Sequence, residues 1–129
     1  LIAFAGISLV TSMIMIGIIT YTSVIERTKE IGVLKALGAR KKDITRVFDA
    51  ETCILGVASG TLGVLIAYLA TFPINAILYN MTELENVAQL NPVHGVILII
   101  VSTVLTMIGG HIPARMAAKK YAAIALRAQ

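Results

Sequence analysis

Three long apolar runs without Lys, Arg, Asp or Glu dominate the chain, at residues 1–25, 52–82 and 86–114. Each is longer than the ~20 residues that a helix needs to cross a hydrocarbon core of about 30 Å. Only 14% of the chain is charged, against about 25% in a typical soluble domain. The pattern therefore predicts an all-α integral membrane protein with three transmembrane helices, over approximately residues 1–24, 53–78 and 93–112.

Two prolines and several polar residues set the expected ends of these spans. Pro73 predicts a kink or an early end of the second span, because proline removes a backbone donor and clashes with the preceding turn. Asn75, Asn80 and residues 82–91 then predict a polar loop. Pro113 is expected to mark the end of the third span.

The distribution of charge predicts the topology. All eleven Lys and Arg residues lie within residues 27–46 or 115–127, and the loop at 82–91, which contains Glu83 and Glu85, has none. Cationic segments stay on the cytoplasmic side during insertion. Residues 26–46 and the tail 113–129 are therefore expected in the cytoplasm, with the N-terminus and the loop outside, in a multi-pass protein of the plasma (inner) membrane. This topology already explains the net charge of +4, so nucleic acid is not an expected partner.

The start of the chain is not typical of a secretory signal peptide. The first apolar run lacks a basic start and a small-residue cleavage site. The chain also begins at Leu1, inside that run, which leads us to expect that it is the C-terminal piece of a longer membrane protein.

The segment between the first two spans predicts a short amphipathic helix. Ile31, Leu34 and Leu37 recur at three-residue steps and form the expected apolar face. Arg27, Glu30 and Lys35 fall at its margins, and Gly38 is a plausible stop because glycine accepts the left-handed conformation. A second helix is expected to start near Lys41 and continue into the second span. Two interpretations remain open: a helix lying on anionic lipid headgroups, or a coupling helix that docks into another protein.

Small residues in the second span predict a surface for helix packing. Gly56, Gly60, Gly63 and Ala67 are spaced by four, three and four positions, so they line one face. Such a face lets another helix approach closely and gain van der Waals contact in lipid. The neighbour could belong to the same subunit or to a second copy.

The candidate chemistry is sparse. The chain contains no G-x-x-x-x-G-K-[ST] phosphate loop, so nucleotide hydrolysis would have to occur on another polypeptide or domain. His94 and His111 are about 25 Å apart along a helix, too far to share a metal. Asp49 and Glu51 are expected to pair with Arg46 or with the basic tail. The sequence therefore predicts a non-catalytic membrane subunit without a catalytic, cofactor or metal site.

Residues 26–39, with the sequence ERTKEIGVLKALGA, resemble the R-x-x-E-I-G-I-L-R-A-L-G-A motif of FtsX-like permease domains, the MacB-type (type VII) ABC transporter family. The identical positions are Arg27, Glu30, Ile31, Gly32, Leu34, Ala36, Leu37, Gly38 and Ala39. The family's Glu at the start of the next helix and the small residues after it are matched by Glu51, Gly56, Gly60 and Gly63. Its C-terminal pattern is matched by Pro113, Ala114, Ala117, Ala118, Ala125, Leu126 and Arg127. The chain departs from the family at Tyr121-Ala122, where Asp-Pro is frequent.

This resemblance covers residues 1–129 and implies a function. It implies a permease domain that works as a dimer with cytoplasmic ABC ATPase subunits, with ATP bound by those partners. The ATPase-coupling residues would then be Arg27, Glu30, Ile31, Leu34, Lys35 and Leu37. Family members use ATP hydrolysis for export, lipoprotein release, sensing of peptide antibiotics or activation of cell-wall hydrolases. An earlier transmembrane helix and an extracytoplasmic domain, expected to set the substrate, would precede Leu1.

Two other classes of function are compatible with the composition. One is a small membrane scaffold that binds anionic lipid through its basic segment and has no ATPase partner. The other is a channel or ion-coupled carrier, which is disfavoured because the spans hold no Asp, Glu, Lys or Arg at mid-membrane.

Overall fold

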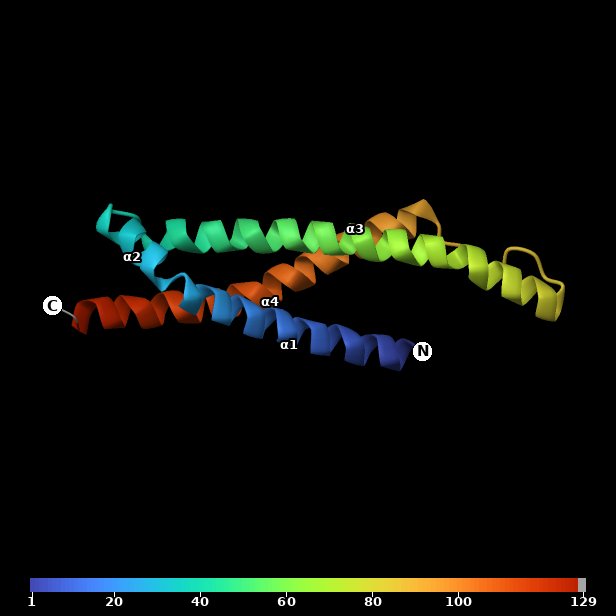
Figure 1. The fold of residues 1–129 in the computed structure, drawn as a ribbon, viewed down its shortest axis with the longest axis horizontal. Helices are drawn as coiled ribbons and strands as arrows, with labels where there is room; N and C mark the ends of the chain where they lie inside the picture. Colours follow the sequence, from blue (N-terminus) through green and yellow to red (C-terminus); the bar gives the residue numbers. More distant parts are fainter. Residues whose placement is uncertain (128–129) are drawn as a thin grey trace.

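The computed structural model describes residues 1–127, with the backbone alone described for residues 117, 118 and 120–127. Four helices follow one another along the chain: α1 (Ile2–Glu26), α2 (Thr28–Ala36), α3 (Lys41–Thr82) and α4 (Pro92–Arg127). Figure 1 shows three long helices that extend along a common axis, with the short α2 near the end where the C-terminus lies. The predicted all-α architecture, with a short helix between the first and second long helices, is confirmed.

The long helices turn most of their large apolar side chains outward. Leu9, Ile14 and Ile18 on α1 are each more than half exposed, and so are Leu62 and Leu65 on α3. The helices α1 and α3 and residues Pro92–Met116 of α4 are long and apolar enough to cross a membrane. An exposed apolar surface of this extent is suited to lipid rather than water, so the chain is a multi-pass membrane protein.

The helix α4 holds the three long helices together. It contacts both α1 and α3, whereas α1 and α3 hardly touch each other. In Figure 1, α4 runs obliquely between the other two. The side chains that α4 presents to its two neighbours therefore determine the packing of the bundle.

Two tight corners separate α2 from its neighbours. The single residue Arg27 lies between α1 and α2. After α2, Gly38 adopts a φ of 93°, which supports its predicted role as a helix stop. The next helix then begins with a capping interaction, since the backbone N–H of Arg40 donates to the carboxylate of Asp43 at 3.0 Å.

The polar loop is shorter than predicted, because α3 continues through Pro73, Asn75 and Asn80 to Thr82. A proline removes only one backbone donor, and the rest of the helical hydrogen bonds can persist around it. The last part of α3 turns away from the direction of its first part in Figure 1, in agreement with a kink. Asn75 ties the loop back to the helix: its side chain donates to the Ala88 carbonyl at 2.9 Å and accepts from the Ala88 N–H at 2.8 Å.

Pro113 does not end its helix either, since α4 continues to Arg127. A proline leaves the carbonyl four residues earlier, here that of Gly109, without its helical donor. On α1, Gly17 lies opposite this point. An added Cβ there would be 3.5 Å from both the Gly109 carbonyl oxygen and the Pro113 ring, so the missing side chain of Gly17 leaves room for the proline.

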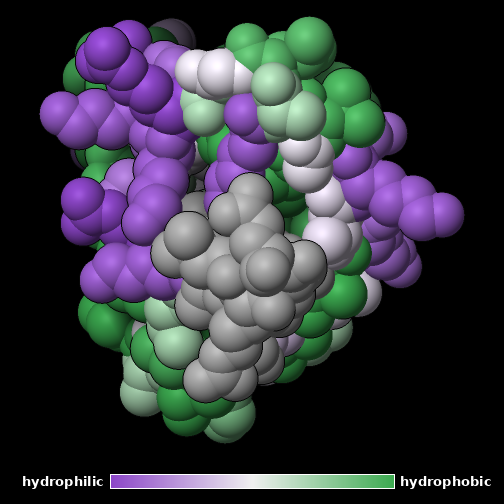
Figure 2. All heavy atoms as spheres, turned by 90° about the vertical axis from the view of Figure 1, so that its left-hand side faces the viewer, coloured by the Kyte–Doolittle hydropathy of each residue, from purple (hydrophilic) through white to green (hydrophobic). Residues whose placement is uncertain are grey.

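One end of the molecule is hydrophilic. All eleven Lys and Arg residues lie on α2 and the corners beside it, on the start of α3 and on the last part of α4. Figure 2 looks at this end and shows hydrophilic side chains spread around apolar ones. The side of the membrane on which this end lies stays a prediction from the charge distribution.

Candidate functional site

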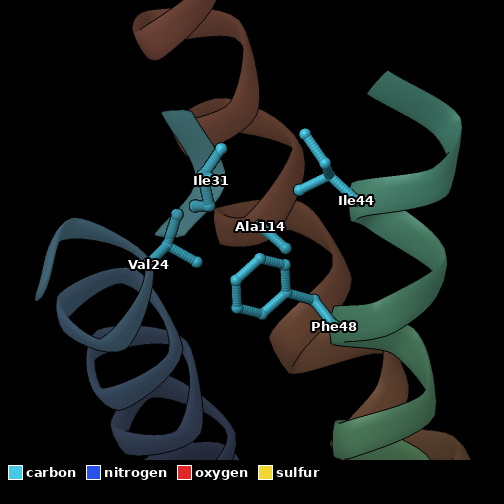
Figure 3. Packing of buried hydrophobic residues seen from close by; sticks show 5 residues of the cluster. All are labelled: Val24, Ile31, Ile44, Phe48 and Ala114. Atoms are coloured by element: carbon cyan, nitrogen blue, oxygen red, sulfur yellow. The ribbon is translucent and has the colours of Figure 1, made fainter. Parts of the chain in front are cut away.

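A small apolar core fastens α2 to the other three helices at the hydrophilic end. It consists of Val24 on α1, Ile31 on α2, Ile44 and Phe48 on α3, and Ala114 on α4. Figure 3 shows the Phe48 ring reaching between α1 and α4 beneath Ile31 and Ala114. Ile31 is only 4% exposed. The short helix therefore has a fixed place against the bundle.

The predicted apolar face of α2 divides between this core and the surface. Ile31 is buried, whereas Leu34 is 43% and Leu37 80% exposed. Three residues of an α-helix turn through about 300°, so each three-residue step moves the side chain back by about 60°. Ile31 and Leu37 are thus about 120° apart, and the three residues do not share one exposed face.

The predicted margin residues also lie in different surroundings. Glu30 is exposed. Lys35 follows Ile31 by one turn, and its amine is buried without a hydrogen-bond partner among the described residues. The exposed apolar residues of α2 and its C-terminal end are Val33, Leu34 and Leu37. We call these three residues the α2 patch.

Arg27 connects the α1–α2 corner to α3. Its guanidinium donates to the Glu51 carboxylate at 2.6 Å. This hydrogen bond, together with the negative charge of Glu51, raises the pKa of Arg27 above its ordinary value. The prediction that Glu51 pairs with Arg46 or with the tail was wrong. The sequence alone does not reveal that the α1–α2 corner packs against α3.

Asp49 forms the second cross-helix pair. Its carboxylate lies 2.7 Å from Nδ1 of His111 on α4. Sequence reasoning expected Arg46 or the tail as partner here too, and treated His111 as an isolated interface residue. The pair joins α3 to α4 next to the apolar core, since Asp49 directly follows Phe48.

Gly56 and Gly60 pack against α4 of the same chain. A Cβ added to Gly56 would lie 2.8 Å from the Cα of Thr103, and one added to Gly60 would lie 3.2 Å from the Cα of Ile99. Real Cβ atoms hardly ever come as close to a backbone as the first of these distances. The absence of side chains thus lets α3 and α4 approach to backbone contact.

Gly63 and Ala67, predicted for the same face, lie beside this contact and not in it. Gly63 has no atom within 4 Å of an added Cβ, and both residues are exposed. They line an open groove of about 320 Å³ between α1, α3 and α4, with Ser12 and Ser102 among the other lining residues. The face predicted from spacing is therefore half occupied within the chain and half open.

Sequence reasoning missed a second pair of packing glycines, Gly109 and Gly110 on α4. Added Cβ atoms would lie 3.2 Å from the Met13 carbonyl of α1 and 2.6 Å from the Thr52 side chain of α3, respectively. Adjacent helical residues point about 100° apart, so each glycine serves a different neighbour. In the sequence, this packing was indicated by two adjacent glycines within an apolar helix.

The described residues contain no group of three or more His, Cys, Asp or Glu side chains that could hold a metal ion. The polar pairs described above connect the α1–α2 corner to α3 and α3 to α4.

Comparison with protein families gives a match over residues 2–122 to the family described as FtsX-like permease C-terminal. The chain belongs to the FtsX-like permease family. The match covers α1, α2, α3 and α4 as far as residue 122, and the 26–39 motif covers α2 and its two corners. Of the C-terminal motif, the side chains of Ala117, Ala118, Ala125, Leu126 and Arg127 lie outside the described residues.

Several curated proteins are similar to this FtsX-like chain. An uncharacterized ABC transporter permease of Methanocaldococcus jannaschii is 36% identical over 115 residues, which are 89% of this chain and 29% of that protein. The macrolide export ATP-binding/permease protein MacB of Pasteurella multocida is 36% identical over 96% of this chain and 18% of its own length. MacB of Shewanella sp. is 48% identical over 67 residues. The chain thus spans less than a third of these relatives, and no solved structure was found to match it.

Proposed function

We propose that this chain is the membrane portion of an ABC transporter permease and transmits the motion of a cytoplasmic ATPase across the bilayer. The observation that carries this proposal is α2: it is fastened by buried Ile31, presents the α2 patch outward, and follows α1 after the single residue Arg27. A push or pull on α2 would reach α1 without a flexible linker. Membership of a permease family and relatives named as ABC transporter permeases support the same function.

The chemistry of α2 favours a protein partner over lipid headgroups. Exposed Glu26, at the end of α1, and exposed Glu30, on α2, precede the exposed apolar residues. A helix that lies on anionic headgroups carries cations on its polar face, whereas a cleft on a protein can accommodate both signs of charge. Leu34 and Leu37 would enter the cleft of the ATPase, with Glu30 at its rim.

The transmitted motion would drive a process on the other side of the membrane. Relatives named for macrolide export suggest export of a small molecule. Lipoprotein release, sensing of peptide antibiotics and activation of cell-wall hydrolases are the other activities that the resemblance implied. We propose that regions outside the matched segment select among them, and that ATP is bound by the partner.

The open half of the glycine face suggests where a second permease copy could pack. Gly63 and Ala67 line the groove between α1, α3 and α4, and small residues allow close approach of another helix in lipid. A transmembrane helix seated there would complete a dimer.

Substitution of Leu34 tests the coupling role. In the full-length protein, Leu34→Asp should leave the chain inserted but reduce co-purification of the ATPase roughly tenfold to hundredfold, because burying one Leu contributes about 1.5–3 kcal/mol. Transport should fall in parallel. The matched control is Ile31→Ala, which removes an apolar group from the internal core and should lower thermal stability instead of acting selectively on the ATPase.

Arg27→Ala should weaken docking less than Leu34→Asp, because Arg27 pairs with Glu51 within the chain and is not part of the α2 patch. Full ATPase co-purification by Leu34→Asp, together with weaker binding to anionic vesicles, would refute the coupling role. The scaffold interpretation, a protein that binds anionic lipid without an ATPase, would then replace it.

A further inference from the structure

A cationic cavity lies between the start of α3 and the second half of α4. Its volume is about 340 Å³, within the range of small-ligand sites. The charged or titratable lining residues are Lys41, Lys42 and Arg46 on α3, and His111, Arg115 and Lys119 on α4. The hydrophilic end seen in Figure 2 includes these segments. We propose that this cavity binds the phosphate of an anionic membrane phospholipid.

The charge of the cavity is not balanced by its own walls. The residues that line it include no Asp or Glu. Of the carboxylates on the same stretch of α3, Asp43 accepts the Arg40 N–H, and Asp49 lies behind the lining residue His111, with which it pairs. Five like charges around one cavity repel one another, and a bound anion relieves this repulsion.

The lining groups suit a phosphate in particular. Arg46 and Arg115 come from opposite walls, and guanidinium groups bind phosphate oxygens through paired N–H donors. His111 is held by Asp49 through Nδ1, which leaves its Nε2 as the ring atom available to a ligand.

The depth of the cavity favours a lipid over a free anion. On α4, the apolar run without charged residues ends at Ala114, and Arg115 follows it, so the lining residues from His111 to Lys119 straddle that end. This is the level of the headgroups, where basic pockets between transmembrane helices bind anionic lipids. The inference requires only that the helices span a bilayer, and it does not depend on an ATPase partner.

An apolar path for the acyl chains adjoins the cavity. Ile108 and Ile112 on α4 are 45% and 57% exposed. They precede His111 and Arg115, respectively, by three residues, and residues three apart are neighbours on a helix surface. A lipid with its phosphate between the arginines can therefore lay its chains along this stripe.

The first test compares lipid retention by full-length protein in nanodiscs of phosphatidylglycerol or phosphatidylcholine, read by native mass spectrometry. The double variant Arg46→Gln/Arg115→Gln should lose bound phosphatidylglycerol by roughly tenfold or more, at about 1 kcal/mol per cation near the surface. The matched control, Lys29→Gln/Arg40→Gln, removes two exposed cations of the same end that do not line the cavity. It should retain the lipid. Equal loss in both variants would mean diffuse attraction by the surface and would overturn the proposal.

Two further arms separate lipid from other anions. Excess inorganic phosphate should not displace phosphatidylglycerol from the wild type; ready displacement would reduce the cavity to a general phosphate site and refute the lipid assignment. Loss of the ATPase by the double variant with lipid retention unchanged would assign the cavity to a protein partner instead.

The last arm needs no substitution. A photoactivatable phosphatidylglycerol should label wild-type peptides that contain residues 41–46 or 108–115 in preference to other bilayer-facing peptides. Uniform labelling along the three long helices would contradict a site.

Discussion

At the scale of single residues, packing depends on the absence of side chains. Gly56 and Gly110 lie where an added Cβ would be 2.8 Å from the Thr103 Cα and 2.6 Å from the Thr52 methyl group, respectively. Thr52 is itself held by hydrogen bonds from its hydroxyl to the carbonyls of Phe48 and Asp49. Neither neighbour can move freely, so both glycines set the distance between α3 and α4.

A single methyl group tests this packing. Gly56→Ala should destabilise the protein by about 1–3 kcal/mol, the usual range for overpacking, because it meets a backbone atom of α4. Gly6→Ala is the matched control: Gly6 has no atom within 4 Å of an added Cβ, and alanine favours a helix over glycine by about 1 kcal/mol. Thermal unfolding in detergent should show a lower melting temperature for the first variant and no decrease for the second. Equal melting temperatures would show that α3 and α4 separate at little cost.

The sequence predicted part of this packing and missed the rest for a definable reason. The spacing of Gly56, Gly60, Gly63 and Ala67 gives a face, but it does not show along which line of that face another helix lies. The helix α4 follows the line with four-residue steps from Gly56 and Gly60 to Val64, whose side chain lies 3.2 Å from a Cβ added to Gly95 of α4. Gly63 lies one residue, or about 100° around the helix, from Val64 and is therefore beside the contact.

At the scale of the elements, α1, α2 and the start of α3 form one braced corner. Ile31 anchors α2 from within, and the pair of Arg27 with Glu51 closes the corner from outside. The sequence predicted the short helix, its stop at Gly38 and the restart near Lys41. Which side of the helix faces inward depended on its contacts in space with the other three helices, through Val24, Phe48 and Ala114, and the local sequence of α2 does not reveal these contacts.

Exchange of the two charges tests the brace. Arg27→Glu alone should place two carboxylates together and lower the melting temperature, and Glu51→Arg alone should do the same with two cations. The double exchange should recover most of the loss, because the attraction is restored in reverse. Both side chains are nearly half exposed, so the shifts should be modest and should shrink at high salt.

The sign of the Arg27 pKa shift adds a control. Because the pKa is raised above an already high value, Arg27 stays charged as the pH rises through the alkaline range, and the wild-type advantage over Arg27→Gln should not fade there. If the double variant is no more stable than either single variant, the two residues lie close together but their attraction does not stabilise the corner.

At the scale of the whole molecule, charge divides the two ends. One end holds all eleven Lys and Arg residues, and the loop at the other holds Glu83 and Glu85 without a cation. Apolar run lengths were enough to predict the number of long helices. Their ends were predicted less well at Pro73 and Pro113, because contacts such as Asn75 with Ala88 and Gly17 with Pro113 support helices that the local sequence alone would end.

Cysteine labelling tests the orientation of these ends. In a Cys53→Ala background, Asn86→Cys should react with a membrane-impermeant reagent on intact cells, and Lys41→Cys should react only after permeabilisation. The physical reason is the cost of moving a cationic segment across the bilayer. The reverse pattern would invert the topology and place the α2 patch where no cytoplasmic ATPase can reach it.

The length of α3 has a geometric consequence for any movement of this domain. Its 42 residues correspond to about 63 Å at 1.5 Å per residue, roughly twice the thickness of the hydrocarbon core. It starts among the lysines beside α2 and continues past Asn75, which holds the returning chain at Ala88, to Thr82. A helix of this kind acts as a lever: a tilt of about 5° about one end displaces the other by about 5 Å at this length. A small rotation of α3 at the cationic end would thus displace the loop at the far membrane surface by several ångströms.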